Sequence, residues 1–162
     1  MALVLAPIAW FVAIPIGHGL VPWLLTWLTP RFGWTDGRPA TWNMLGLIPI
    51  AFGAALLLWI LFLGLSRYEE LPERVDIGWK PQLLLVRGPY TFTRNPMYLA
   101  ELGLWAGWAV FFGSAAVAAG AVALFLVVRL VVVREERDLE AKFPDRYREY
   151  KATVPRWIRL PR

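Results

Sequence analysis

The chain has 162 residues, of which 58% are hydrophobic, 15% aromatic and only 18% charged. A soluble domain of this length is about half apolar and a quarter charged. Because the apolar residues also form long blocks, the composition excludes a soluble fold and predicts a single all-α membrane domain with about four spans. The absence of cysteine excludes disulfides, thiolate metal sites and c-type haem attachment. The formal charge of +5 fits loops beside anionic lipid better than nucleic-acid binding.

Two spans are predicted in residues 1–65. The first runs from Ala2 to about Leu28 and is expected to kink or break near Gly17, His18 and Gly19. A polar connection follows, and the second span covers residues 43–65. That block has 23 residues without an ionisable side chain, which at roughly 1.5 Å per residue crosses a hydrocarbon core of about 30 Å.

Three further segments complete the expected domain. Residues 66–96 are rich in charge and are predicted to be cytoplasmic. Residues 97–133 are apolar and predict a tight helical hairpin that turns at Gly113 and Ser114. Residues 134–162 are charged throughout and predict an amphipathic helix followed by an extended tail.

The distribution of lysine and arginine predicts orientation. Five lie in residues 66–96 and nine from position 134 onward, against two in residues 29–42. The positive-inside rule places the rich segments, and with them the N-terminus, in the cytoplasm. We expect a multi-pass protein of a bacterial inner membrane with its active site on the cytoplasmic side.

Ionisable side chains inside predicted spans are candidates for function, because burying them in lipid costs several kcal/mol unless they are paired or hydrated. Glu101 and Arg129 qualify, although they can also simply pair with each other within the hairpin. His18 is the only histidine and is interpreted as a packing or kink residue. No metal site is expected.

The most informative stretch is RGPYTFTRNPMY, from Arg87 to Tyr98. Pro96 is expected to open a helix, and free backbone donors at such a terminus suit an anionic group such as a carboxylate. After the predicted hairpin comes a second stretch, REERDLEAKFPDRYREYKATVPRW, from Arg134 to Trp157.

This pair of stretches resembles the isoprenylcysteine carboxyl methyltransferase and phospholipid methyltransferase superfamily of integral membrane enzymes. The family pattern is a G-x-Y-x-x-x-R-H-P-x-Y element, a helical hairpin, an acidic pair, and a C-terminal F-G-x-x-Y-x-x-Y-x-x-x-V-P element. The matching positions here are Gly88, Tyr90, Arg94, Asn95, Pro96, Tyr98, Glu135, Glu136, Phe143, Tyr147, Tyr150, Val154 and Pro155.

The resemblance implies that S-adenosylmethionine is the cofactor and that a C-terminal helix closes its cytoplasmic pocket. Carried over by position, the cofactor-binding residues are Gln82, Leu83, Leu84, Leu85, Tyr90, Asn95, Pro96, Met97, Tyr98 and Glu135. Asn95 replaces the family's histidine and cannot act as a cation or base at neutral pH. A substrate-facing arginine of some members falls at Val131 here, with Arg129 and Arg134 on either side.

The expected reaction is an in-line methyl transfer to a lipophilic or membrane-embedded acceptor, which depends on positioning and desolvation. The catalytic candidates are Arg94, Glu136 and Arg129, and the substrate-binding candidates are Arg129, Arg134 and Glu101. An isoprenoid or prenylcysteine-like carboxylate would be oriented by the arginines. A phospholipid amine would give a proton to Glu136 or Glu101.

Two other functions are compatible with parts of the pattern. A membrane reductase of the sterol-reductase type has a similar R-x-P-x-Y element and would use NADPH. A non-catalytic membrane scaffold or small transporter subunit would have no need of paired motifs across a hairpin. Binding of S-adenosylhomocysteine rather than NADPH distinguishes the methyltransferase from the reductase.

Overall fold

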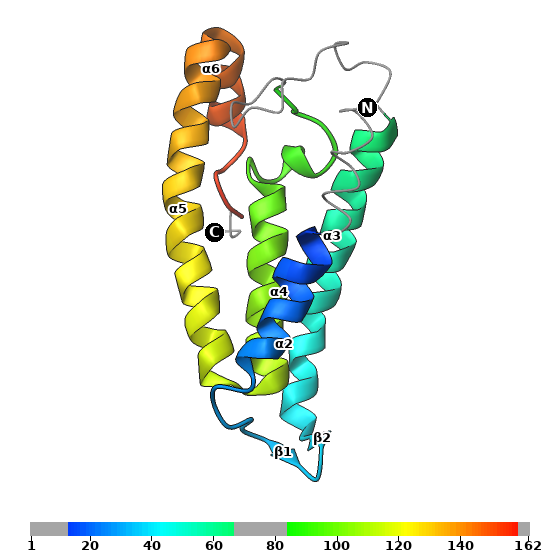
Figure 1. Ribbon diagram of the computed structural model, residues 1–162. Coiled ribbons are helices and arrows are strands. Elements are labelled where there is room, and N and C mark those ends of the chain that lie inside the picture. Colours follow the sequence, from blue (N-terminus) through cyan, green and yellow to red (C-terminus); the bar gives the residue numbers. More distant parts are fainter. Residues whose placement is uncertain (1–12, 67–83, 159–162) are drawn as a thin grey trace, which may run out of the picture. The chain divides into compact units, whose positions relative to one another are not determined.

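The computed structural model describes residues 13–66 and 84–158, so residues 1–12, 67–83 and 159–162 lie outside the described part. The chain divides into two compact units. Unit 1 comprises residues 1–55 and 100–126, and unit 2 comprises residues 56–99 and 127–162. The described residues are mostly helical, as expected, and the long helices α3 (Leu47–Ser66), α4 (Pro96–Phe112) and α5 (Ala115–Lys142) contribute to both units (Figure 1).

Two helices are long and apolar enough to cross a membrane. One is the continuous helical stretch Thr41–Gly64, in which the 3-10 helix η2 (Thr41–Gly46) leads into α3. The other is α5. The first agrees with the span predicted over residues 43–65. Helix α4 has 17 residues, and the helical residues 13–25 are shorter still, so the described residues support two of the four predicted spans by length and hydropathy.

The predicted hairpin turn in unit 1 is present at Gly113 and Ser114. Gly113 has a φ of +58°, and a Cβ atom there would collide with the carbonyl of Phe32. Asn43 is completely buried and its Nδ2 donates hydrogen bonds to the carbonyls of Phe32 and Val110, both at 3.1 Å. These bonds satisfy one carbonyl in the last turn of α4 and one in the loop that precedes Trp34, and they fix the turn within unit 1.

A short hairpin precedes η2. Strands β1 (Trp34–Thr35) and β2 (Arg38–Pro39) are antiparallel and are joined by Asp36 and Gly37. Both connecting residues have positive φ, 49° and 74°, as a two-residue hairpin turn requires.

Small residues allow η2 and the unit 1 part of α3 to approach α4 closely. A Cβ atom at Gly107 would lie 2.7 Å from the carbonyl oxygen of Gly46, and one at Gly53 would lie 2.6 Å from that of Ala100. Close backbone approach at glycine is a common way for helices to associate in membranes. In lipid, the burial of apolar surface contributes little to helix association. The sequence contains these glycines, but their pairing is visible only in the structure.

The irregularity expected near Gly17 is a π-helical turn, η1 (Ile16–Leu20), followed by α2 (Val21–Leu25). His18 lies in this turn. Its Nδ1 accepts a hydrogen bond from Trp105 Nε1 at 3.1 Å, and its carbonyl accepts one from Trp108 Nε1. A π-helical turn often marks a functional or strained position.

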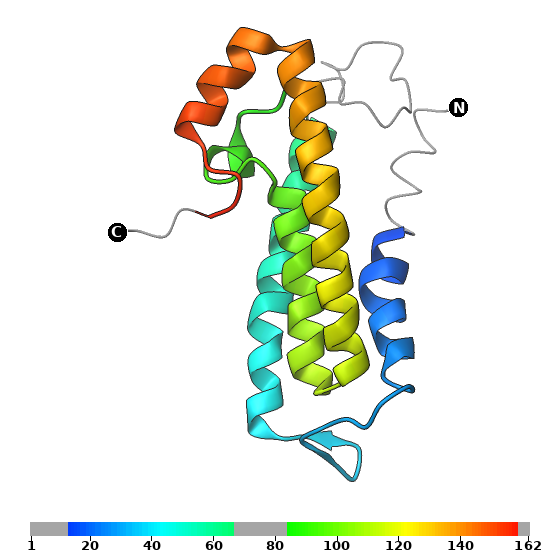
Figure 2. The ribbon, with the colours of Figure 1, turned by 90° about the vertical axis from the view of Figure 1, so that its left-hand side faces the viewer.

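Unit 2 contains the C-terminal part of α5, the helix α6 (Pro144–Thr153) and the loop before α4, which includes the 3-10 helix η4 (Gly88–Thr91). Figure 2 shows α6 folded back toward this loop. The sequence predicts that the last span ends at residue 133 and that a new helix follows, whereas α5 continues without a break to Lys142. The extension consists largely of good helix formers, and the first proline after the span is Pro144.

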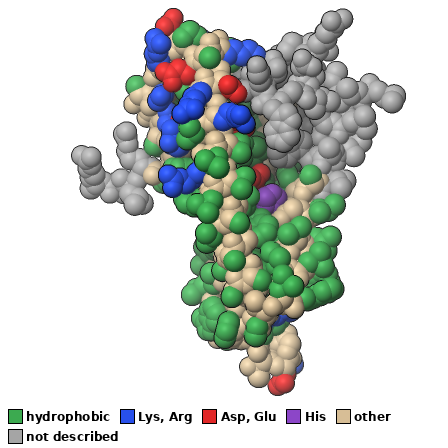
Figure 3. All heavy atoms as spheres, turned by 60° about the vertical axis from the view of Figure 1, so that its left-hand side comes forward, with side chains coloured by type: hydrophobic (Ala, Val, Ile, Leu, Met, Phe, Trp, Pro, Cys, Tyr) green, Lys and Arg blue, Asp and Glu red, His purple; other side chains and the backbone are tan. Residues whose placement is uncertain are grey.

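Charge is concentrated on one part of unit 2. On the face shown in Figure 3, lysine, arginine and acidic side chains gather over the C-terminal part of α5 and over α6. Large hydrophobic side chains are exposed elsewhere, among them Ile48 at 67% and Leu130 at 75% of their surface. Exposed apolar surface of this extent is typical of helices that face lipid.

Candidate functional site

The candidate site is a cavity inside unit 2. Its volume is about 150 Å³. The loop before α4, the first turn of α4, the C-terminal part of α5 and α6 all contribute to its wall. The lining residues are Leu84, Leu85, Tyr90, Arg94, Asn95, Pro96, Met97, Tyr98, Glu135, Glu136, Leu139, Tyr147 and Tyr150.

Tyrosines of α6 form an aromatic part of this wall. Tyr147 and Tyr150 are 1% and 8% exposed and pack with Leu139 and Tyr90. The hydroxyl of Tyr150 donates a 2.7 Å hydrogen bond to the carbonyl of Tyr90, which ties α6 to η4. Burial raises the pKa of Tyr147 to about 12, and the nearby charge of Glu136 acts in the same direction. These phenols therefore stay protonated at neutral pH.

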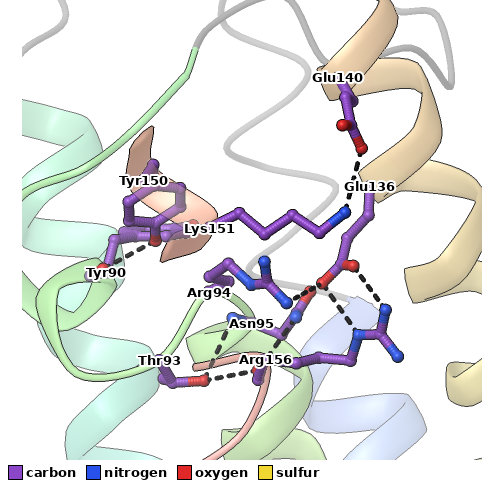
Figure 4. Close-up of polar contacts among 9 residues, drawn as sticks. All are labelled: Tyr90, Thr93, Arg94, Asn95, Glu136, Glu140, Tyr150, Lys151 and Arg156. Atoms are coloured by element: carbon purple, nitrogen blue, oxygen red, sulfur yellow. Dashed lines mark hydrogen bonds and ion pairs between the residues drawn. The ribbon is translucent and has the colours of Figure 1, made fainter. Parts of the chain in front are cut away.

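A buried carboxylate joins two arginines next to the cavity (Figure 4). Glu136 Oε1 lies 3.3 Å from Arg94 Nη2. Arg156 donates from Nε to Oε1 at 3.1 Å and from Nη2 to Oε2 at 2.7 Å, so its guanidinium is bidentate. The hydrogen bonds with Glu136 raise the pKa of Arg156. Both carboxylate oxygens of Glu136 are thus engaged by guanidinium groups.

The backbone around Arg94 is held by the C-terminal segment. Arg94 N donates to the carbonyl of Pro155 at 3.0 Å. The carbonyl of Arg156 accepts hydrogen bonds from Thr93 Oγ1 at 3.0 Å and from Asn95 Nδ2 at 3.1 Å (Figure 4). Asn95 therefore fastens the loop to the C-terminal segment, a role that needs a donor and no titratable group.

Three buried polar atoms of the site have no hydrogen-bond partner among the described residues. They are Arg94 Nε, Arg94 Nη1 and Tyr147 Oη. A buried donor without a partner costs about 1–3 kcal/mol, so such groups are rare unless a ligand or solvent satisfies them. Because Arg94 and Tyr147 both line the cavity, a ligand with an anionic or acceptor group at this place would satisfy them.

A second acidic group, Glu135 of α5, lies against the first turn of α4. Tyr98 Oη donates a 2.7 Å hydrogen bond to Glu135 Oε1, and both residues line the cavity. Pro96 occupies the first position of α4, as predicted. The cavity therefore presents a cationic and phenolic group, a carboxylate and apolar walls to one small molecule.

The structure brings together most of the residues predicted from the sequence. Leu84, Leu85, Tyr90, Asn95, Pro96, Met97, Tyr98, Glu135, Arg94 and Glu136 all line the one cavity. Gln82 and Leu83 lie outside the described residues. Arg129 and Arg134 are not among the lining residues.

Glu101 lies in unit 1. Its Oε1 is 3.8 Å from Nε2 of His18, and the side chains are 13% and 15% exposed. No acid lies near His18 along the sequence, and the fold brings Glu101 to it from 83 positions away. The described residues contain no group of three or more side chains suited to a metal ion.

Two important residues were missed. Arg156 was not a candidate, because a single arginine after Val154 and Pro155 gives no sign of where its side chain turns. Tyr147 was matched to the family pattern without a role. Its spacing of three positions from Tyr150 was no guide, since only the packing of α6 shows that its hydroxyl is buried with no partner among the described residues.

Comparison with known proteins gives a family match over most of the described chain. Residues 43–146 match the family described as phospholipid methyltransferase. An uncharacterized protein of Haemophilus influenzae is 38% identical over 63 residues, which are 38% of this chain and 100% of that protein. No solved structure matches.

Proposed function

Because the chain belongs to the phospholipid methyltransferase family, we propose that it methylates the amine of a phospholipid headgroup with S-adenosylmethionine. Members of this family are S-adenosylmethionine-dependent methyltransferases. The observation that carries the proposal is the cavity of unit 2, where Arg94 and Tyr147 present buried donors that have no partner among the described residues.

The donor set of the cavity fits the cofactor. S-adenosylmethionine carries a carboxylate, for which Arg94 Nε, Arg94 Nη1 and Tyr147 Oη are suitable donors. Its ammonium and ribose hydroxyls need acceptors, and Oε1 of Glu135 can accept a second hydrogen bond beside that from Tyr98. Leu84, Leu85 and the ring of Tyr90 offer apolar surface for an adenine ring.

The cofactor supplies a methyl group on a sulfonium, so that an acceptor lone pair bonds to the methyl carbon while the carbon–sulfur electron pair returns to sulfur. No covalent enzyme intermediate is required, and the residues act by positioning and by excluding water. A phospholipid ammonium must first release one proton. Glu136 is poorly suited to receive it, because both its oxygens accept hydrogen bonds from Arg156 or lie against Arg94.

Glu135 is the better proton acceptor. Its Oε1 is occupied by Tyr98, and its Oε2 accepts no hydrogen bond from the described residues. We assign the proton to Oε2, with Glu136 acting as a positioning residue that holds Arg94. This changes the role foreseen for Glu136 from base to support.

The direct test is transfer of labelled methyl from S-adenosylmethionine to phosphatidylethanolamine in vesicles. Wild-type protein should label the lipid. Glu135→Gln keeps an acceptor for Tyr98 and should bind S-adenosylhomocysteine normally but lose at least about tenfold in turnover, whereas Glu135→Ala should lose binding as well. Labelling of a prenylated cysteine and not of phosphatidylethanolamine would refute the amine acceptor.

A further inference from the structure

A second cavity in unit 2 combines apolar walls with two arginines that have no assigned role. It is lined by Leu63, Leu84, Leu85, Val86, Arg87 and Arg146, and its volume is about 190 Å³. Leu63 comes from α3, Arg87 from the residue before η4, and Arg146 from α6. Leu84 and Leu85 also line the first cavity, so the two cavities share part of one wall.

The two arginines are available to a ligand. Both are exposed, and neither forms an ion pair or side-chain hydrogen bond with any described residue. The neighbouring cations of α6 differ, since Arg148 and Lys151 pair with Glu140. Two guanidinium groups at the edge of an apolar cavity repel each other and attract an anion, and guanidinium groups match phosphate oxygens particularly well.

The apolar walls restrict the kind of anion. Four of the six lining residues are leucine or valine, which a free inorganic phosphate would leave in contact with water. An amphiphile that carries its phosphate beside hydrocarbon satisfies both parts of the cavity at once. Phe62 and Trp59, on the same helix as Leu63, expose 71% and 48% of their surface. They add further apolar surface along α3.

We propose that this second cavity holds the phosphodiester of the acceptor phospholipid, with Arg87 and Arg146 on the phosphate and Leu63 and Val86 against the first carbons of an acyl chain. Because Leu84 and Leu85 line both cavities, a phospholipid bound in this way would direct its headgroup amine toward the first cavity. This inference rests on the proposed function for the direction of the headgroup. Binding of the phospholipid in this second cavity can be measured without methyl transfer.

The test compares wild-type protein with R87Q/R146Q, and uses R137Q as a control. Arg137 is also exposed, carries the same charge and lines neither cavity. Retention of phosphatidylethanolamine by the purified protein is measured by native mass spectrometry against diacylglycerol with the same acyl chains. S-adenosylhomocysteine binding is measured on the same samples.

We expect wild-type protein to retain phosphatidylethanolamine at least about tenfold better than diacylglycerol, and R87Q/R146Q to lose that preference. R137Q should keep it, and all three should bind S-adenosylhomocysteine with affinities that agree within about twofold. In the transfer assay the double variant should raise the half-saturating lipid fraction more than it lowers the maximal rate.

Equal retention of both lipids by wild-type protein, or an equal loss in R137Q, would overturn the phosphate site. Displacement of the lipid by millimolar inorganic phosphate would reassign the site to the free anion and overturn it as well. Arginine-dependent lipid retention without any methyl transfer would uphold the phosphate site and refute the proposed function, so the two failures are distinguishable.

Discussion

The guanidinium of Arg94 lies 3.3 Å from the carboxylate of Glu136, and both side chains are more than nine-tenths buried. Only Nη2 of Arg94 is engaged in this way, while Nε and Nη1 have no partner among the described residues. The ion pair therefore fixes one corner of the guanidinium and leaves two donors beside the cavity. This arrangement is typical of an arginine that is held by the protein in order to bind a ligand.

Replacement of Arg94 by lysine separates charge from geometry. Arg94→Lys keeps a cation near Glu136 but removes the planar fork, so we expect a loss of turnover of at least about tenfold, or roughly 1.4 kcal/mol. The melting temperature should change little. Turnover and thermal unfolding measured on one preparation check this. Near-wild-type turnover would show that Arg94 only anchors the loop.

Removal of Glu136 should destabilise unit 2. Glu136→Gln leaves Arg94 buried without a counter-charge, and breaking a buried pair in this way costs about 3–5 kcal/mol. Arg156→Gln should cost less, about 1 kcal/mol or under, because that side chain is 42% exposed. Thermal unfolding of both variants in detergent shows which of them loses more stability. Equal losses of stability in the two variants would contradict the claim that the buried Arg94–Glu136 pair stabilises unit 2 more than Arg156 does.

Tyr147→Phe should separate stability from ligand binding. The variant removes a buried hydroxyl that no other described residue hydrogen-bonds, so the ligand-free protein should be as stable as wild type or more stable. Affinity for S-adenosylhomocysteine should fall by about tenfold or more, since a hydrogen bond to a charged group is worth roughly 1.5–3 kcal/mol. Calorimetry and thermal unfolding of the same samples check both parts. Lower stability with unchanged affinity would assign the hydroxyl a structural role.

The same tyrosine predicts a change of stability at alkaline pH. Its pKa is about 12 in the folded protein and about 10 when unfolded. The raised value means that its contribution to stability is full below about pH 10 and is lost as the pH rises toward 12. Melting temperatures between pH 9 and 11 should therefore fall less steeply in Tyr147→Phe than in wild type, and parallel curves would contradict this.

The glycine contacts of unit 1 predict a packing defect. Gly107→Ala places a Cβ atom 2.7 Å from the carbonyl oxygen of Gly46, and the backbone must shift to relieve the overlap. We expect a loss of about 1–3 kcal/mol. Gly64→Ala is the matched control, because nothing lies within 4 Å of its Cβ position. Similar melting temperatures for the two variants would argue against a close helix contact at Gly107.

Much of the helical pattern could be predicted from the sequence, because long apolar blocks and helix-opening prolines are local signals. The span over residues 43–65 and the turn at Gly113 are examples. The site was predicted as far as the family pattern reached, which included Arg94, Glu135 and Glu136. The contact of Arg156 with Glu136 spans 20 positions and that of His18 with Glu101 spans 83. Such pairings depend on tertiary packing and have no local signal.

The most direct test of the account is calorimetric titration of the purified full-length protein in detergent with S-adenosylhomocysteine, and separately with NADPH. The cavity of unit 2 predicts saturable binding of S-adenosylhomocysteine, with affinity reduced at least about tenfold in Glu135→Ala, and no comparable binding of NADPH. A folded sample that binds no S-adenosylhomocysteine, or that binds NADPH in preference, would contradict the assignment of this cavity as the cofactor site.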